Sequence, residues 1–149
     1  MKISAKADYA VRAAAVLASV PTGDLVKGEQ VARAQGIPLE FLENILREMR
    51  VAGIVVAQRG SDGGYALARP ASEITVAEVV DAVDGAHAGV QRIRFEDLAY
   101  SGAATRLSDV WLAMRASMQS VLESVTLADL ASGELPSSIL EIVDAPSPR

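Results

Sequence analysis

The amino-acid sequence predicts a mainly α-helical fold with one small β-hairpin and a long helix in the C-terminal half. Two features carry this prediction. Apolar residues recur every three or four positions through much of the 149-residue chain, which is typical of amphipathic helices. Two short runs, residues 54–58 and 65–69, instead have the composition of strands and flank a connector rich in glycine. The predicted order is three helices, the hairpin, a further helix and the long helix.

The first two helices are expected over residues 3–20 and 27–35. A turn at residues 21–24, which contains Pro, Gly and Asp, separates them. The second helix is short, with Val31 and Ala32 facing inward. The inward face of the first helix consists of small or apolar residues, namely Ala7, Val11, Ala14, Leu17 and Ala18.

A third helix is expected over residues 38–52, between a turn at Gly36 and a terminating Gly53. Two helices joined by a short turn, the second with an outward polar stripe, form a helix-turn-helix candidate. An ordinary helical hairpin is the alternative for this stretch alone. The inward face of the third helix is Leu42, Ile45, Leu46 and Met49, and the outward stripe is Glu40, Glu43, Asn44 and Arg47.

The hairpin favours the first alternative, because three helices followed by a hairpin is the order of a winged helix-turn-helix. The connector contains Gly60, Gly63 and Gly64, which are expected to allow positive φ and a flexible tip. Arg59 lies at the base of this tip and Ser61 within it, and an arginine there suits a narrow DNA minor groove. A solvated surface arginine is the alternative. The connector lacks the Lys-Ser/Thr of a phosphate-binding loop and precedes a strand, which argues against nucleotide binding.

A helix that starts after Thr75 is expected to follow the hairpin. Thr75 and Glu78 have the spacing of a capping box, and the helix should run through Val83 and stop at Gly85. The residues that it is expected to bury are Val76, Val79, Val80 and Val83. Residues 86–105 have no clear period, so they are predicted to form a loop with a short turn near 95–98.

The long C-terminal helix has an unusually large apolar face. A single helix after a compact domain does not easily bury such a face within one chain, so the sequence predicts an antiparallel helix pair in a two-fold homodimer. A helix packed only on its own domain is the alternative. The predicted interface is Leu107, Val110, Trp111, Met114, Met118, Val121, Leu122 and Val125. A short capped helix at 126–130 is expected to pack back on the domain, and residues 136–149 to form a tail in which 139–143 can dock.

Composition narrows the function classes. Residues 1–70 carry nine Lys or Arg and seven Asp or Glu, a formal charge of +2, whereas residues 71–149 carry five and twelve, a formal charge of −7. This asymmetry suggests that one half faces nucleic acid and the other points away from it. The chain has no cysteine and one histidine, and it shows no paired carboxylates or nucleophile with a histidine partner, so we expect no enzyme. No apolar run is long enough to span a membrane, and a cytoplasmic location is expected.

Several short motifs, read together in this order, are highly specific and extend over nearly the whole chain. They are 8–12 (DYAVR), 35–38 (QGIP), 41–43 (FLE), 59–60 (RG), 63–70 (GGYALARP), 74–76 (ITV), 83–85 (VDG), Trp111 and 125–130 (VTLADL). With these motifs the sequence resembles the Rrf2 family of bacterial transcriptional regulators, and it is similar to the iron–sulfur cluster regulator and nitric-oxide-responsive repressor branches.

The resemblance implies a homodimeric winged-helix repressor or activator on a palindromic site in double-stranded DNA. It implies that Glu40, Phe41, Glu43 and Asn44 lie where family members touch base edges and backbone, and that Arg59 enters the minor groove. Lys6 and Tyr9 would lie near phosphates or in the packing of the first helix. With the residues from the polar stripe and the hairpin tip, the predicted DNA-binding set is Lys6, Tyr9, Glu40, Phe41, Glu43, Asn44, Arg47, Arg59 and Ser61.

The chain departs from the family pattern in its lack of cysteine. Family members that sense iron, nitric oxide or redox state carry cysteines in the loop that corresponds to residues 86–105. Asp8 matches the position of an additional carboxylate ligand in one branch, but Asp8 and His87 are as well explained as a surface carboxylate and a loop imidazole. We therefore expect no iron–sulfur cluster and no metal. A small molecule in the loop region, a partner protein or no signal at all remain open as effectors.

The sequence thus predicts a DNA-binding transcriptional regulator that works without an iron–sulfur cluster. A repressor is favoured over an activator. A winged-helix module for protein interaction, or a regulator that needs a partner because its own DNA binding is weak, is the alternative. The predicted division of the chain is a winged helix-turn-helix domain at 1–70, a linking helix at 71–85, a loop at 86–105, a dimerisation helix and short packing helix at 106–135, and a tail at 136–149.

Overall fold

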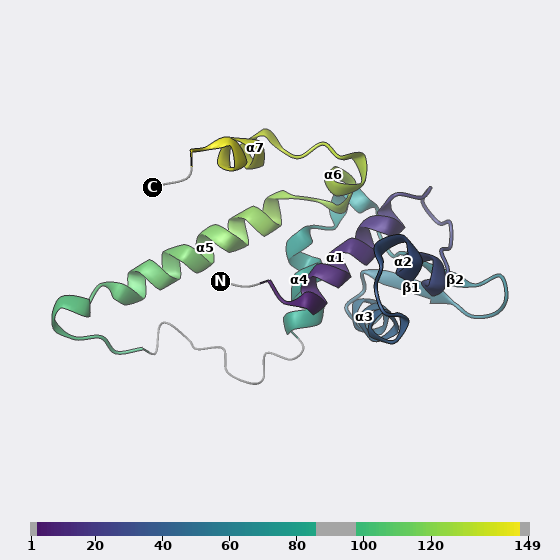
Figure 1. Ribbon diagram of the computed structural model, residues 1–149, viewed down its shortest axis with the longest axis horizontal. Helices are drawn as coiled ribbons and strands as arrows, with labels where there is room; N and C mark the ends of the chain where they lie inside the picture. Colours follow the sequence, from purple (N-terminus) through teal and green to yellow (C-terminus); the bar gives the residue numbers. More distant parts are fainter. Residues whose placement is uncertain (1–2, 86–97, 147–149) are drawn as a thin grey trace.

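The computed structural model describes residues 3–85 and 98–146, and it shows a mainly helical chain with one antiparallel hairpin (Figure 1). The predicted fold class is confirmed. The elements in order are α1 (Ala5–Ala18), α2 (Gly28–Gln35), α3 (Leu39–Val51), β1 (Val55–Gln58), β2 (Gly64–Leu67), the 3₁₀ turn η1 (Ala71–Glu73), α4 (Val76–Asp84), the 3₁₀ turn η4 (Gly102–Ala104), α5 (Leu107–Ser124), α6 (Leu127–Ser132) and α7 (Ser137–Asp144).

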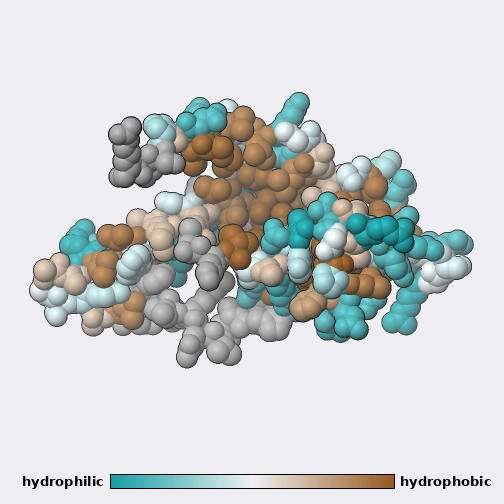
Figure 2. All heavy atoms as spheres, viewed as in Figure 1, coloured by the Kyte–Doolittle hydropathy of each residue, from teal (hydrophilic) through white to brown (hydrophobic). Residues whose placement is uncertain are grey.

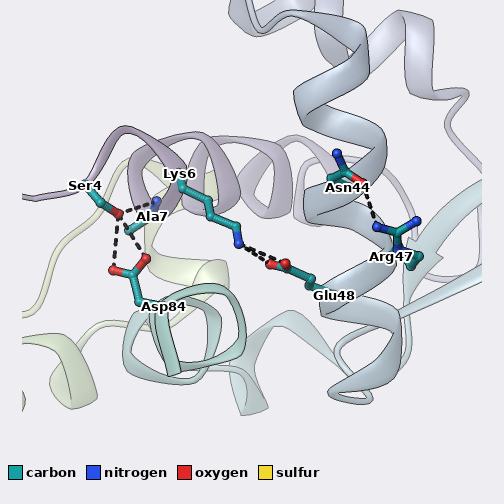
Figure 3. A network of polar contacts seen from close by, with 7 residues as sticks. All are labelled: Ser4, Lys6, Ala7, Asn44, Arg47, Glu48 and Asp84. Carbon is teal, nitrogen blue, oxygen red and sulfur yellow. Dashed lines mark hydrogen bonds and ion pairs between the residues drawn. The ribbon is translucent and has the colours of Figure 1, made fainter. Parts of the chain in front are cut away.

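Helix α1 is the centre of the helical domain, where it contacts α2, α3, α4 and α6. Four alanines and one leucine form its buried face, and short side chains let the neighbouring helices approach closely. Ser4 caps the helix by accepting a hydrogen bond from the Ala7 N–H at 3.0 Å. The Ser4 hydroxyl also donates to the carboxylate of Asp84 at 3.0 Å, which joins the start of α1 to the end of α4 (Figure 3).

The helix-turn-helix geometry follows from one glycine and one apolar stripe. Gly36 ends α2 in the left-handed conformation, with φ of 62°, which turns the chain into α3. Pro38 is the residue before the helix rather than its first residue. The predicted inward residues Leu42, Ile45, Leu46 and Met49 are all buried, so the opposite face of α3 lies at the surface.

The hairpin is joined to the helical domain by a short third segment. Strands β1 and β2 pair antiparallel, with Val55 opposite Leu67 and Gln58 opposite Gly64. Val26, which lies between α1 and α2, exchanges two 2.8 Å backbone hydrogen bonds with Tyr65. The wing is therefore fixed against the domain at the start of β2, beside the connector loop.

Two of the three connector glycines have the positive φ that the sequence predicted, Gly60 with 105° and Gly64 with 158°. Close backbone approach adds a second requirement. At Gly63 a Cβ atom would lie 2.1 Å from the Gln58 carbonyl oxygen, and at Gly64 it would lie 2.7 Å from that of Val26. Gly63 is thus required by close backbone approach alone, and Gly64 by close approach together with its φ.

The capping box predicted at α4 forms on one side only. Thr75 accepts a hydrogen bond from the Glu78 N–H at 3.2 Å, as expected. The Glu78 carboxylate instead pairs with Arg69 at 2.6 Å, which ties the end of the wing to α4. Val79 and Val83 are buried, whereas Val76 and Val80, also predicted inside, are half-buried.

The C-terminal elements include one helix that the sequence did not predict. Helix α5 projects from the domain with its N-terminal end farthest away, and its C-terminal end leads into α6, which packs on α1 (Figure 1). Within the expected tail, residues 137–144 form the helix α7. Of the predicted loop, residues 98–105 contain the turn η4, whereas His87 and most of the turn expected near 95–98 lie outside the described residues.

Candidate nucleic-acid interface

Helix α3 holds the predicted polar stripe at the surface. Glu40, Glu43, Asn44 and Arg47 are all exposed, because the buried residues on the other side of the helix fix its rotation. Arg47 donates a 2.6 Å hydrogen bond to the Asn44 side-chain oxygen, one turn back along the helix (Figure 3). This contact aligns the two side chains along the outer face.

A groove of about 600 Å³ lies between α3, the wing and the start of α2. Glu43, Arg47 and Arg59 line it, so the structure brings these three predicted residues together. The six charged residues on its walls are four bases and two acids, which makes the groove basic in a chain of net charge −5. They are Lys27, Arg47, Arg50 and Arg59, with Glu29 and Glu43.

Lys27 and Arg50 are groove residues that sequence reasoning missed. Arg50 follows Arg47 by three positions, a spacing that places both on neighbouring parts of one helix surface. Lys27 directly precedes α2, so it carries a positive charge at the helix end where backbone N–H groups already favour anions. The first signal is present in the sequence, whereas the second needs the position of α2 beside the wing.

Arg59 extends from the end of β1 into the groove. It is exposed, and it lies on the β1 side of a turn that a 3.0 Å hydrogen bond from the Gly63 N–H to the Gly60 carbonyl closes. Ser61 is exposed at the same tip. The wing therefore offers an arginine on a loop whose base is fixed by hydrogen bonds to the domain.

Lys6 and Tyr9 belong to α1 and line a hollow with α3 that is separate from the groove beside the wing. Both carboxylate oxygens of Glu48 approach the Lys6 amine at 2.8 Å, which links α1 to α3 (Figure 3). Lys6 and Tyr9 line a second hollow, of about 370 Å³, together with Phe41 and Asn44. Lys6 and Tyr9 were predicted to lie near DNA phosphates or in the packing of the first helix. The structure shows them in contacts between α1 and α3, and a contact with phosphates stays a prediction.

Asp8 takes part in contacts within the helical domain. Its carboxylate lies 3.0 Å from Arg12 Nε, and Arg12 donates to the Gln35 carbonyl oxygen at 2.8 Å. The Arg12 guanidinium also stacks over the Tyr9 ring, 4.9 Å from its centroid. Of these contacts, the hydrogen bond to Gln35 joins α1 to the end of α2.

The predicted dimer residues of α5 differ in exposure. Val110 is 55% exposed, Met114 38% and Val121 36%. Leu107, Trp111, Met118 and Leu122 are half-buried, and the Trp111 indole donates to the Tyr100 hydroxyl at 3.2 Å. Val125 differs from the rest, because it follows the helix and its own chain leaves it only 7% exposed.

Apolar surface extends along this part of the molecule. Figure 2 shows a broad apolar area near α7 and the C-terminal half of α5, whereas the wing end is hydrophilic. Among the described helices, none is both long and apolar enough to cross a membrane.

Comparison with known proteins places this arrangement in a family. Residues 3–133 match the Rrf2 family profile, which is described as an iron-dependent transcriptional regulator. The chain is 51% identical over 144 residues to the HTH-type transcriptional regulator Rv1287 of Mycobacterium tuberculosis, covering 97% of this chain and 89% of that one. It is 33% identical to the HTH-type transcriptional regulator IscR of Cereibacter sphaeroides, covering 91% and 90%.

Solved structures agree with the sequence relatives. The global cysteine regulator CymR of B. subtilis matches with a TM-score of 0.73 and 28% identity over 89% of this chain and 98% of that chain. IscR of T. potens matches with a TM-score of 0.70 and 28% identity over 99% and 94%. The chain therefore belongs to the Rrf2 family, and it is a DNA-binding transcriptional regulator rather than an enzyme.

Proposed function

We propose that the protein binds a palindromic operator as a homodimer, with α3 in the major groove and Arg59 in the adjacent minor groove. The observation that carries this proposal is the basic groove between α3 and the wing, where four of six wall charges are positive. Positive side chains there gain affinity by releasing counterions from the DNA backbone. The acidic remainder of the chain is repelled by DNA, which favours one orientation.

The reason to propose a second copy of the chain, and hence a homodimer, is the exposed apolar face of α5. Val110, Met114 and Val121 expose apolar surface on a helix that projects from the domain, and a two-fold helix pair would cover it. A two-fold dimer presents two recognition helices to equivalent half-sites, which is why the operator should be palindromic. A dimer over promoter DNA obstructs polymerase, so we propose that it represses transcription, and access to DNA requires a cytoplasmic location.

We propose further that regulation does not use an iron–sulfur cluster. The family description is iron-dependent, but cysteine thiolates are the normal cluster ligands and this chain contains none. Over residues 3–85 and 98–146, no three His, Cys, Asp or Glu side chains are placed to hold a metal ion. Asp8 is already paired with Arg12. The residues present do not fit the cluster, so a small molecule or a protein is the proposed effector.

Selection of genomic fragments by the purified, metal-free protein tests the function. We expect sequencing of the retained fragments to give a two-fold symmetric motif. The same selection is repeated with Arg59→Ala, a change that removes a groove cation without touching the core. We expect this variant to retain DNA more weakly than the wild-type protein. A folded dimer that enriches no sequence would overturn the proposal and favour the protein-interaction alternative.

A further inference from the structure

The exposed side chains at the start of α3 include no hydrogen-bond donor. Of the first five residues of the helix, Leu42 is buried and the other four are exposed. These four are Leu39, Glu40, Phe41 and Glu43, and each is either apolar or a carboxylate that accepts hydrogen bonds when ionised. Recognition helices reach base edges mainly with their N-terminal residues, so this part of α3 limits which bases can be read.

The hydrogen-bonding groups on the base edges determine which bases the start of α3 can recognise. Guanine presents only acceptors in the major groove, its N7 and O6, and a carboxylate repels them. Cytosine and adenine present amino groups that a carboxylate can accept from, and thymine presents its C5-methyl group to an apolar side chain. The start of α3 therefore suits amino groups and methyl groups.

Phe41 is the apolar side chain that the protein itself leaves uncovered. It is 61% exposed, against 37% for Leu39, and Leu39 lines the groove on the wing side. Phe41 instead borders the hollow of about 370 Å³ on the α1 side.

The polar neighbours of this hollow contact one another. Lys6 pairs with Glu48 at 2.8 Å, and Arg47 bonds to Asn44 at 2.6 Å (Figure 3). These contacts hold the polar groups around the exposed ring, so an apolar group entering beside Phe41 would meet a preformed surface.

We propose that Phe41 is a specificity-determining residue that packs against the C5-methyl group of a thymine in each operator half-site. This inference rests on the proposed function, because it requires α3 to lie in the major groove. It names a base and a single chemical group on that base, which the proposed function leaves open.

Replacement of thymine by uracil tests the contact, because the two bases differ only in the C5-methyl group. The genomic fragment most enriched in the selection is amplified with either dTTP or dUTP, and the affinity of the full-length protein for each product is measured by fluorescence anisotropy. One buried methyl group contributes about fourfold in affinity. We therefore expect a thymine-to-uracil ratio of about fifteenfold, because the proposal places one such contact in each of two half-sites.

Protein variants distinguish loss of the methyl contact at Phe41 from any effect of uracil on the stiffness of the DNA. Phe41→Ala should reduce the ratio to near one, and Phe41→Leu should retain part of it. Val51→Ala is the matched control: Val51 is apolar, 83% exposed and on the same helix, but at its C-terminal end, so the wild-type ratio should persist.

Two results would overturn the inference while leaving the proposed function intact. One is specific binding with equal affinity for thymine and uracil DNA, and the other is a ratio that Phe41→Ala leaves unchanged. Loss of all sequence-specific binding by the wild-type protein would instead overturn the proposed function, and the inference with it.

Discussion

Glu43 lies on the exposed face of α3 and lines the groove beside the wing. A carboxylate there can accept a hydrogen bond from a cytosine amino group, and it repels guanine and phosphate. We expect Glu43→Ala to relax base preference at one operator position, at a cost of about 1–3 kcal/mol against the preferred base. Repeating the selection with the variant measures this, and an unchanged motif would make Glu43 a helix-surface residue only.

Arg59 supplies one of the positive charges of the groove. Each positively charged side chain that contacts a phosphate or enters the minor groove adds about one unit to the slope of log affinity against log salt concentration. Arg59→Ala should weaken binding and reduce that slope by about one. Binding titrations at several salt concentrations measure the slope, with Arg33→Ala as a control on the exposed surface of α2. An unaltered slope would remove Arg59 from the DNA interface.

Single residues also show how far a sequence can predict a site. The spacing of Glu40, Glu43, Asn44 and Arg47 placed them on one face, because helical period alone fixes that result. The pairing of Lys6 with Glu48 could not be predicted, because 42 residues separate them in sequence and their contact depends on the packing of α1 on α3.

At the scale of elements, the wing depends on glycines that permit close approach. A Cβ at Gly64 would lie 2.7 Å from the Val26 carbonyl oxygen, where the wing joins the domain. Gly64→Ala should therefore destabilise the fold by about 1–3 kcal/mol. Urea denaturation measures the change, and Gly85→Ala, with nothing within 4 Å of its added Cβ, is the control. Equal stability of both variants would contradict the close approach.

The helices were predicted unequally well for a related reason. Helix α3 buries all four residues predicted inside, because its apolar stripe is regular. Helix α1 was predicted less exactly, because alanines occur all round it: Val11 and Ala18 are only half-buried, and the buried Ala10 and Ala13 were missed. Helix α7 has only eight residues and none of them is buried, and Pro136 and Pro146 bracket it. A segment that short has little periodicity, and prolines at both ends are equally typical of a tail.

At the scale of the whole molecule, the exposed apolar face of α5 is the reason to expect a homodimer rather than a monomer. Fully burying a side chain such as Val or Met contributes about 1.5–3 kcal/mol, and a two-fold axis counts each contact twice. Val110 and Met114 lie one turn apart and are 55% and 38% exposed.

We therefore expect the double change Val110→Glu and Met114→Glu to convert the proposed dimer into a folded monomer. The new carboxylates would face each other across the two-fold axis and would lose hydration there. Sedimentation equilibrium measures the mass, and DNA affinity should fall together with it, because a monomer contacts only one half-site. Val51→Glu, which adds a charge at an 83% exposed valine on α3, should leave the mass unchanged. A double variant that remains a dimer would move the interface away from α5, and α7, with its exposed Leu140, Ile142 and Val143, would be the next surface to change.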